Sequence, residues 1–387
     1  MTRVAVVGGG IVGFASAYYL AERGAEVTVL EQGRIGHGST PRAGGGIREQ
    51  FSTPVSVALS RRSVEVWESF EERFGVDIDY RRHGYLYLAR ERATAERLRE
   101  AVAFHDDQGV PSRYVAPEET VEYCAGIRTE QYAGGTYCPT DGYADPERAL
   151  QGFALAAARE GVEVRLGRRV TDVLTEGGAE SGRVTGVATD GDRVEADYVV
   201  NAAGAWAPAV AGMAGVELDV RPSRRQLAVV APATPLDPSG PFVTDLDTGT
   251  YFRPEDERLS YVGGHVGEDR AVDPDGFDRR HDPTWASEAV ERAYDCATHF
   301  GPGSEVVDGW AGLYALTPDH HPVIEEVRPG LVVAAGFSGH GFMQSPATGQ
   351  CVAELVTEGA ATTVDVSGLT NDRFERGEAF EETFYSA

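Results

Sequence analysis

The sequence predicts an α/β fold (α+β overall) in which a discontinuous parallel-sheet domain is interrupted by an inserted antiparallel-sheet domain. Two observations predict it. Residues 1–31 have the pattern of a strand, a glycine-rich turn, a helix and a second strand, which is the order of a βαβ unit. Farther along, helical segments alternate with groups of short strand-like runs such as 84–89 and 224–231, which suit an antiparallel sheet.

The first element is an apolar strand over 4–7, and Gly8-x-Gly10-x-x-Gly13 follows it directly. Gly8 allows the tight turn, Gly10 lets a pyrophosphate approach the backbone, and Gly13 lets the helix pack on the sheet. The second strand ends at Glu31, whose carboxylate suits both hydroxyls of an unphosphorylated ribose. We therefore predict a Rossmann-like dinucleotide site with the pyrophosphate at the helix N-terminus. The alternative is a glycine-rich turn that opens an ordinary α/β domain.

The later elements follow from local signals, such as the Asp145-Pro146 pair that begins a helix. The helical stretches are 54–74, 91–108, 145–160 and 343–358, and the strands include 84–89, 162–166, 183–188, 193–201, 224–231, 249–253, 259–265 and 331–335. This order predicts a cofactor domain of 1–78, 142–218 and 304–365, a substrate domain of 79–141 and 219–303, and a tail of 366–387. A ligand cleft is expected between the two domains.

The composition limits the partners and the location. The 387 residues carry a net charge of −26, and all 35 basic residues are arginine. This charge argues against nucleic acid and suits a salt-rich cytoplasm, with an acidic mesophilic enzyme from a GC-rich genome as the alternative. Without lysine, the chain forms no Schiff base. The sequence contains no run of ~18 apolar residues, so no membrane span is predicted. No signal peptide is recognised either, and a cytoplasmic protein is expected.

The cysteines give no sign of a metal centre or a redox pair. Cys124, Cys138, Cys296 and Cys351 form no CxxC motif, so four free thiols are expected. His320 and His321 stand beside Asp319, but they fall in a loop motif and are interpreted as surface or flavin-edge residues. No metal site is predicted.

Several motifs together carry a resemblance that covers nearly the whole chain. Beyond the N-terminal unit they are STPRAGGGIREQ (39–50), DGYADPERA (141–149), NAAGAW (201–206), TYFRP (250–254) and GFSGHGF (336–342). The chain resembles the D-amino-acid-oxidase-like FAD enzymes, in particular the group of sarcosine oxidase, dimethylglycine dehydrogenase and the proline dehydrogenase β-subunit. The resemblance implies FAD as the cofactor and oxidation of an amine as the reaction.

The resemblance also implies which residues contact FAD. The backbone after the glycines of GFSGHGF faces the flavin ring, where N–H groups and a helix dipole stabilise the negative charge of the reduced ring. Arg42 is expected near a phosphate. The implied cofactor-binding residues are Gly8, Gly10, Ile11, Val12, Gly13, Glu31, Gln32, Ser39, Thr40, Arg42, Gly45, Val170, Ala203, Gly204, Trp206, Gly312, Gly336, Ser338, Gly339, His340, Gly341, Phe342 and Met343.

Four residues match the substrate side of the flavin in sarcosine-type relatives. Arg48 matches the arginine that binds the substrate carboxylate, a role suited to a guanidinium fork; a structural ion pair is the alternative. Tyr251, His265 and His340 match residues that line the substrate, and either histidine could accept the amine proton or favour the neutral amine. The alternatives are packing for Tyr251 and a turn for His265.

The chain departs from those relatives at three places. It lacks a flavin-tethering cysteine in 311–314 and a tethering histidine after Thr40, so FAD is expected to be non-covalent. Tyr261 stands where monomeric sarcosine oxidases have the lysine that activates dioxygen, which favours a dehydrogenase. Met343 stands where they have a second carboxylate-binding lysine, which leaves the exact substrate open.

Together these residues predict oxidation of a secondary or tertiary amino acid, such as proline, sarcosine or an N-methylglycine, by hydride transfer from the α-carbon to flavin N5. Electrons are expected to pass to an electron-transfer flavoprotein, a quinone or a partner subunit. One alternative is oxidation of a 2-hydroxy acid, which requires a histidine base. Another is a flavin-binding subunit that is inactive without its partner. A nicotinamide-dependent reductase is disfavoured because no second GxGxxG motif is present.

Overall fold

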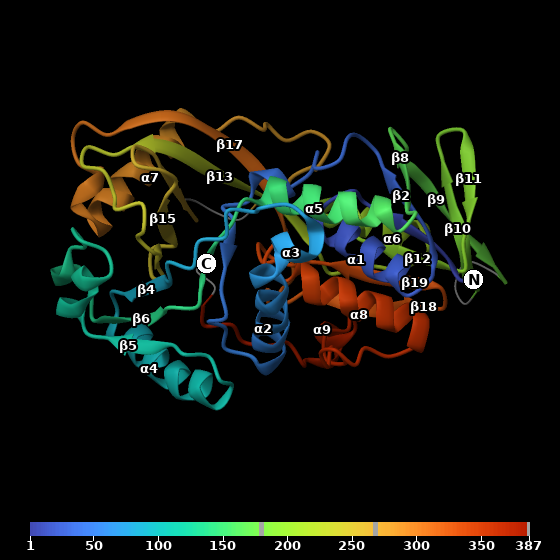
Figure 1. Ribbon diagram of the computed structural model, residues 1–387, viewed down its shortest axis with the longest axis horizontal. Coiled ribbons are helices and arrows are strands. Elements are labelled where there is room, and N and C mark those ends of the chain that lie inside the picture. Colours follow the sequence, from blue (N-terminus) through green and yellow to red (C-terminus); the bar gives the residue numbers. More distant parts are fainter. Residues whose placement is uncertain (178–181, 266–269, 385–387) are drawn as a thin grey trace.

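A six-stranded sheet carries the N-terminal βαβ unit, and it lies on the right in Figure 1. The computed structural model describes residues 1–177, 182–265 and 270–384. The strand order is β18-β19-β12-β1-β2-β8, with every neighbouring pair parallel except β18 and β19. The strands are β1 (Arg3–Val7), β2 (Glu26–Glu31), β8 (Glu163–Leu166), β12 (Tyr198–Asn201), β18 (Val323–Arg328) and β19 (Leu331–Ala335).

An eight-stranded sheet forms the other half of the molecule, on the left in Figure 1, and all its pairs are antiparallel except β14 with β4. Its order is β17-β13-β16-β15-β14-β4-β6-β5. The strands are β4 (Tyr85–Ala89), β5 (Arg113–Val115), β6 (Gly134–Cys138), β13 (Arg221–Ala231), β14 (Phe242–Asp245), β15 (Thr250–Pro254), β16 (Ser260–Gly264) and β17 (Glu305–Leu316).

Two small sheets complete the β-structure of the described residues. β3 (Gly46–Ile47) pairs with β7 (Gly142–Tyr143), and β9 (Val170–Glu176), β10 (Arg183–Thr189) and β11 (Asp192–Glu195) form a three-stranded sheet. The α-helices are α1 (Ile11–Glu22), α2 (Pro54–Glu68), α3 (Phe70–Phe74), α4 (Arg92–Asp107), α5 (Pro146–Arg159), α6 (Ala207–Met213), α7 (Pro283–Cys296), α8 (Ser345–Glu358) and α9 (Arg373–Arg376). None of the described helices is long and apolar enough to cross a bilayer.

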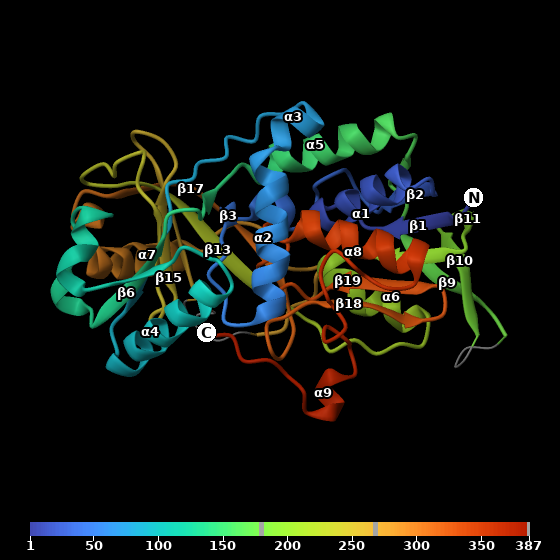
Figure 2. The same ribbon diagram turned by 60° about the horizontal axis from the view of Figure 1, so that its bottom comes forward.

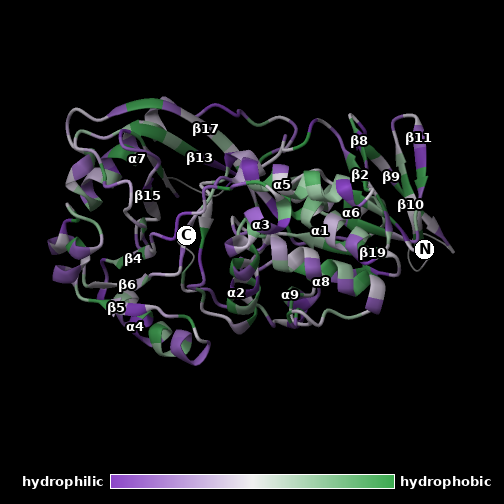
Figure 3. Cartoon of the chain, viewed as in Figure 1, coloured by the Kyte–Doolittle hydropathy of each residue, from purple (hydrophilic) through white to green (hydrophobic). Residues whose placement is uncertain are grey.

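The largest core lies where helices cover the six-stranded sheet (Figure 2). α1 and α8 approach closely because Gly349 has no side chain: a Cβ there would lie 2.7 Å from the backbone carbon of Ala15. Aromatic rings of α2, α3 and α5 fill the space beside them, with Trp67 stacked on Phe70 at 5.3 Å between ring centroids. Figure 3 shows the contrast with the exposed strand β11, which is largely hydrophilic. This packing fixes where the first turn of α1 points.

Most of the predicted elements are confirmed. Asp145 caps α5 by accepting hydrogen bonds from the backbone N–H groups of Glu147 and Arg148, as expected of an acid before proline. Three features differ from the expectation. The predicted helical stretch 54–74 is two helices, α2 and α3, which are separated at Ser69. The predicted strand 193–201 is two strands, β11 and β12, in different sheets, and β17, at the start of the 304–365 segment, pairs with β13 in the eight-stranded sheet.

Candidate active site

A cavity lies between the two main sheets, and the first turn of α1 and the residues just before α8 line it. The glycine-rich turns before these helices, Gly8–Gly10 and Gly336–Gly341, line its wall. Both helices begin after strands of the parallel sheet, so the cavity lies at the carboxyl ends of β1 and β19, where ligands bind in open α/β sheets.

At the α1 end, Gly8 and Gly13 make the close backbone contacts that the motif predicts. Gly8 has φ +116°, and a Cβ there would lie 2.5 Å from the carbonyl oxygen of Ala202. A Cβ on Gly13 would lie 2.0 Å from the carbonyl oxygen of Gly8, so Gly13 packs beneath the turn and does not line the cavity. The N–H groups of Val12 and Gly13 have no hydrogen-bond partner among the described residues. Such an end of a helix binds an anion.

Two side chains hold the rim of this turn. Glu31, buried at the end of β2, accepts hydrogen bonds from the backbone N–H groups of Gly9 (2.9 Å) and Gly33 (2.7 Å). Thr40 Oγ1 accepts the N–H of Ile11 at 3.1 Å. The cradle therefore presents glycine backbone, a fixed carboxylate and helix N–H groups to the same space, which fits a dinucleotide.

At the α8 end, the GFSGHGF segment forms a tight turn with positive φ at Gly336, Ser338 and Gly339. A Cβ on Gly339 would lie 2.5 Å from the ring of Tyr314, so this approach requires glycine. The N–H groups of Gly341, Phe342 and Met343 have no hydrogen-bond partner in the described parts of the chain, and these three residues line the cavity. The turn thus places N–H donors where a flavin ring could accept them.

Arg48 lines the cavity with only 3% of its surface exposed. Its guanidinium stacks on the ring of Phe51, 3.8 Å from the ring centroid. Nη1 donates to the carbonyl oxygen of Gln50, and Nη2 donates to Nε2 of His340 (3.0 Å) and to the carbonyl oxygen of Phe384 (3.3 Å). No carboxylate pairs with Arg48 among the described residues, so the structural ion pair that the sequence left open is absent from them.

His340 is buried beside this guanidinium. Because arginine can only donate, Nε2 of His340 accepts the bond and a neutral ring carries its proton on Nδ1. Burial, followed by the Arg48 charge, lowers the pKa of His340 well below its usual range. His340 is therefore a neutral acceptor that orients Arg48.

Tyr251 lies on β15, and its ring covers Gly263 of the neighbouring strand β16. A Cβ on Gly263 would lie 2.1 Å from the ring, so the lack of a side chain at Gly263 makes room for Tyr251. Burial raises the pKa of the Tyr251 hydroxyl above its usual range. His265 lies at the end of this pair of strands and also lines the cavity, 6.4 Å from the ring of Tyr314 between centroids.

Sequence reasoning missed an aromatic wall beside Arg48. Tyr85 and Tyr87 alternate with leucines along β4, and Tyr85 stacks on Phe242 with 4.3 Å between ring centroids. The alternation was visible in the sequence, but which face of the strand meets a cavity was not. Phe384, from the tail, also lines this side and packs against Tyr87 at 5.0 Å.

The cavity brings the sequence-predicted residues together. The lining includes Arg48, Tyr251, His265, His340 and all the implied cofactor residues except Gly13. Tyr261 is not part of the lining; its ring lies beneath the Arg253 guanidinium at 4.3 Å and beside Trp310. His321 is buried, not superficial: Asp319 Oδ1 accepts its backbone N–H, and its ring bonds Thr53 at 2.9 Å.

The four cysteines are free, and each is buried. None lines the cavity. Burial raises the pKa of Cys124, Cys296 and Cys351 to about 12, so these thiols stay protonated.

Comparisons with known proteins agree with this geometry. Residues 3–355 match the family described as FAD dependent oxidoreductase. Among curated proteins, the chain is 31% identical to a glycine oxidase of Geobacillus kaustophilus, over 91% of this chain and 92% of that protein. It is 28% identical to the mitochondrial sarcosine dehydrogenase of Homo sapiens, over 92% of this chain but only 40% of that protein.

Among solved structures, the chain is similar to an L-proline dehydrogenase from P. horikoshii. The TM-score is 0.87 and the sequence identity is 32%, and the match covers 97% of this chain and 98% of the other. The likeness therefore extends over both sheets of this chain.

Proposed function

Because the chain belongs to the FAD-dependent oxidoreductase family, we propose that it oxidises a secondary or tertiary amino acid of the proline, sarcosine or N-methylglycine type. The observation that carries the proposal is a buried arginine, Arg48, that lines the cavity with its guanidinium on the ring of Phe51 and near that of Tyr87. A desolvated guanidinium binds a carboxylate strongly, and the rings accept the apolar part of an amino acid. The similarity to a proline dehydrogenase and a sarcosine dehydrogenase supports this choice.

FAD would bind without a covalent bond. Its pyrophosphate would lie at the N-terminus of α1, its adenosine ribose at Glu31, and its ring against the N–H groups of Gly341 to Met343. The burial of the cysteines away from the cavity supports non-covalent binding. When bound, FAD supplies the acceptor for the hydride and its two electrons.

Arg48 would hold the substrate carboxylate and so orient the α-carbon. A guanidinium can give two parallel hydrogen bonds to a carboxylate through Nε and Nη2 or through Nη1 and Nη2. Both arrangements use Nη2, whose hydrogen bonds here go to Nε2 of His340 and to the carbonyl oxygen of Phe384. A carboxylate bound by two parallel hydrogen bonds must therefore replace one of these acceptors. The Phe384 bond is the longer of the two, so we propose that the substrate displaces Phe384.

The proton chemistry assigns different roles to the two histidines. The lowered pKa of His340 and its bond from Arg48 make it a poor proton acceptor. His265 lines the same cavity and is the histidine that we propose takes the amine proton or favours the neutral amine. Loss of hydride from the α-carbon of the neutral amine leaves a C=N bond. Water hydrolyses this bond, whereas the product from proline remains as a cyclic imine.

Electrons would pass to an acceptor other than dioxygen, such as an electron-transfer flavoprotein, a quinone or a partner subunit. The absence of lysine from the sequence and the position of Tyr261 outside the cavity lining support this proposal. A fixed ammonium beside the flavin stabilises developing superoxide, and a tyrosine does not replace it.

The test is an anaerobic titration of the purified protein against proline, sarcosine, N,N-dimethylglycine, glycine and a set of 2-hydroxy acids, followed by bleaching of the flavin absorbance. We expect bleaching by a secondary or tertiary amino acid, slow recovery in air and fast recovery with an artificial electron acceptor. Bleaching by hydroxy acids alone would contradict the proposed substrate class. Acid precipitation should release all the FAD into the supernatant, and yellow colour in the pellet would contradict non-covalent binding.

A further inference from the structure

Asp141 lies beside Arg48 in the small ribbon of β3 and β7. The ribbon pairs Ile47 with Gly142, so this register continued by one residue sets Arg48, which follows β3, across from Asp141, which precedes β7. Asp141 is the first residue of the DGYADPERA motif, and the function proposed above assigns no role to it. Its side chain is fully buried.

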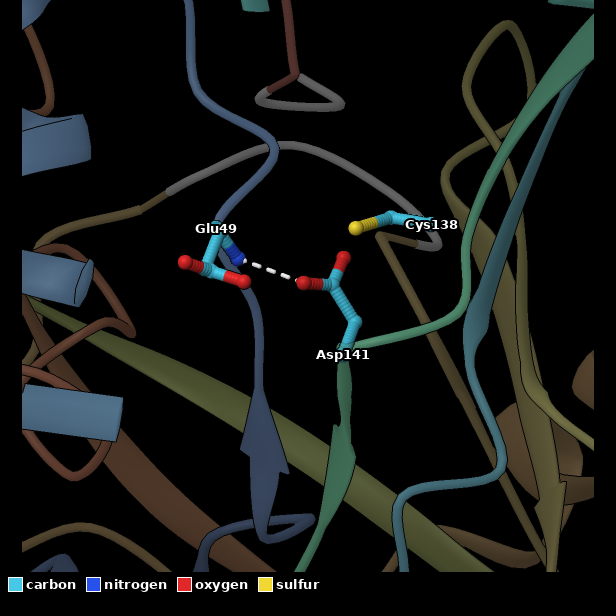
Figure 4. A group of neighbouring side chains, drawn as sticks. All are labelled: Glu49, Cys138 and Asp141. Carbon is cyan, nitrogen blue, oxygen red and sulfur yellow. Dashed lines mark hydrogen bonds between the residues drawn. The ribbon is translucent and has the colours of Figure 1, made fainter. Parts of the chain in front are cut away.

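The carboxylate of Asp141 makes two hydrogen bonds to the segment that follows Arg48. Oδ1 accepts the backbone N–H of Glu49 at 2.7 Å, which is the bond drawn in Figure 4. Oδ2 accepts Nε2 of Gln50 at 3.0 Å. The two residues directly after Arg48 are thus fixed by one side chain.

Gln50 carries this restraint to the guanidinium. Its side chain also donates to the carbonyl oxygen of Tyr85 (3.2 Å) and accepts from Thr136 Oγ1 (2.8 Å), which ties it to two strands of the eight-stranded sheet. Its backbone carbonyl accepts from Nη1 of Arg48. The chain of contacts therefore runs from Asp141 through Gln50 to Arg48.

We infer that Asp141 is a positioning residue that sets the orientation of Arg48 for a carboxylate ligand through Gln50. The inference rests on the proposed role of Arg48. Hydrogen bonds of a buried carboxyl group are not replaced by water when they are removed, so their loss lets the segment shift. A displacement of about 1 Å in a binding group is enough to weaken a bidentate contact.

A metal site is the other interpretation of this place, because ligand atoms of Glu49, Cys138 and Asp141 lie within 4.8 Å of one another (Figure 4). The hydrogen bonds favour the network. Both oxygens of Asp141 accept N–H groups, and Glu49 Oε2 accepts Thr140 Oγ1 at 2.6 Å. Burial also keeps the Cys138 thiol protonated, because it raises the pKa of that thiol above its usual range.

The test compares Asp141→Asn with Glu49→Gln in the FAD-loaded protein. Both substitutions remove one carboxylate from the same buried cluster, but Glu49 makes no side-chain bond to Gln50 or Arg48. The probe is pyrrole-2-carboxylate, a planar carboxylate without an oxidisable α-hydrogen. Its dissociation constant is measured by calorimetry and by the change in flavin absorbance. The wild type and Arg48→Lys serve as references.

We expect Asp141→Asn to weaken probe binding about tenfold, and Glu49→Gln to change it less than twofold. In turnover the same loss should appear in KM, with kcat changed less than threefold. Thr136→Val removes only the outer anchor of Gln50 and should weaken binding about threefold, so it decides the matter if Asp141→Asn fails to fold. Equal losses in Asp141→Asn and Glu49→Gln, or an unchanged dissociation constant in Asp141→Asn and Thr136→Val, would overturn the inference.

Failure of the proposed function gives a different pattern. If the wild type does not bind the probe, or if Arg48→Lys binds it as tightly as the wild type, Arg48 is not a carboxylate site and the inference falls with it. If Arg48→Lys loses binding while Asp141→Asn keeps it, only the inference is wrong.

Discussion

Arg48 combines burial with contacts that restrict it from several sides. Its guanidinium lies on the Phe51 ring, and its donors reach a backbone carbonyl, a histidine nitrogen and the tail. Such restraint prepares a binding group for its ligand, because little side-chain entropy is left to lose. The arrangement also makes the site sensitive to the shape of the cation as well as to its charge.

Arg48→Lys should therefore raise the substrate concentration for half-maximal flavin reduction about 100-fold, since an ammonium offers no parallel pair of donors. Anaerobic reduction traces at increasing substrate concentration measure this. Arg148→Lys on the exposed surface of α5 is the matched control and should leave the value unchanged. A loss of less than threefold in Arg48→Lys would contradict a bidentate contact.

Asp141 gives a pH-dependent signature in stability. Burial, and next the nearby Glu49, raise the pKa of Asp141 from 3.8 to about 7 in the folded protein. The folded state then holds a proton that the unfolded state has already lost, so this group's contribution to stability declines as pH rises toward about 7 and is constant above it.

Urea unfolding of the wild type and Asp141→Asn from pH 5.5 to 8 checks this. The free energy of unfolding of the wild type, relative to the variant, should fall by up to about 1.4 kcal/mol per pH unit below pH 7 and level off above. A flat difference over the whole range would show that Asp141 is ionised throughout.

At the scale of elements, β15 and β16 shape the cavity because Gly263 on β16 has no side chain and leaves space for the Tyr251 ring on β15. Gly263→Ala would place a Cβ 2.1 Å from the Tyr251 ring, so the ring or the strand must move. We expect a loss of about 1–3 kcal/mol in unfolding free energy together with a shifted flavin absorbance. Gly212→Ala on α6 is the control, because a Cβ there meets nothing within 4 Å; it should be neutral or slightly stabilising.

The same scale separates what the sequence could predict from what it could not. The glycine-rich turns and the capped helix α5 are encoded by neighbouring residues, so their positions followed from the chain itself. The partner of β17 and the split of 193–201 into β11 and β12 depend on pairing between distant segments. A single Asp197 side chain, which accepts the N–H of Arg3 at 2.8 Å, helps fix the bend between those two strands.

The candidate site divides in the same way. Arg48, Tyr251, His265 and His340 were reached through motifs, and one cavity contains all four. The aromatic wall of Tyr85 and Phe242 and the arrival of Phe384 were not predicted, because no local pattern tells which strand face or which tail will meet a cavity.

For the whole molecule, the net charge of −26 is the dominant electrostatic property. Like charges on one surface repel each other, and salt screens them over about 10 Å at 0.1 M and about 3 Å at 1 M. We expect Tm to rise by several degrees between 0.1 and 2 M KCl, measured by differential scanning calorimetry. A Tm that is constant or falls with salt would contradict the prediction of a protein adapted to a salt-rich cytoplasm.

The end of the chain has a practical meaning for anyone who purifies this protein. Phe384 is 3% exposed, and its carbonyl oxygen accepts a hydrogen bond from Arg48. A fusion partner inserted directly after Phe384 would therefore begin next to the cavity wall. The N-terminus lies at the right edge of the molecule in Figures 1 and 2, near β11. A cleavable tag is better placed at the N-terminus. A comparison of the substrate KM between proteins with a fusion at either position would show whether the Phe384 contact with Arg48 affects substrate binding.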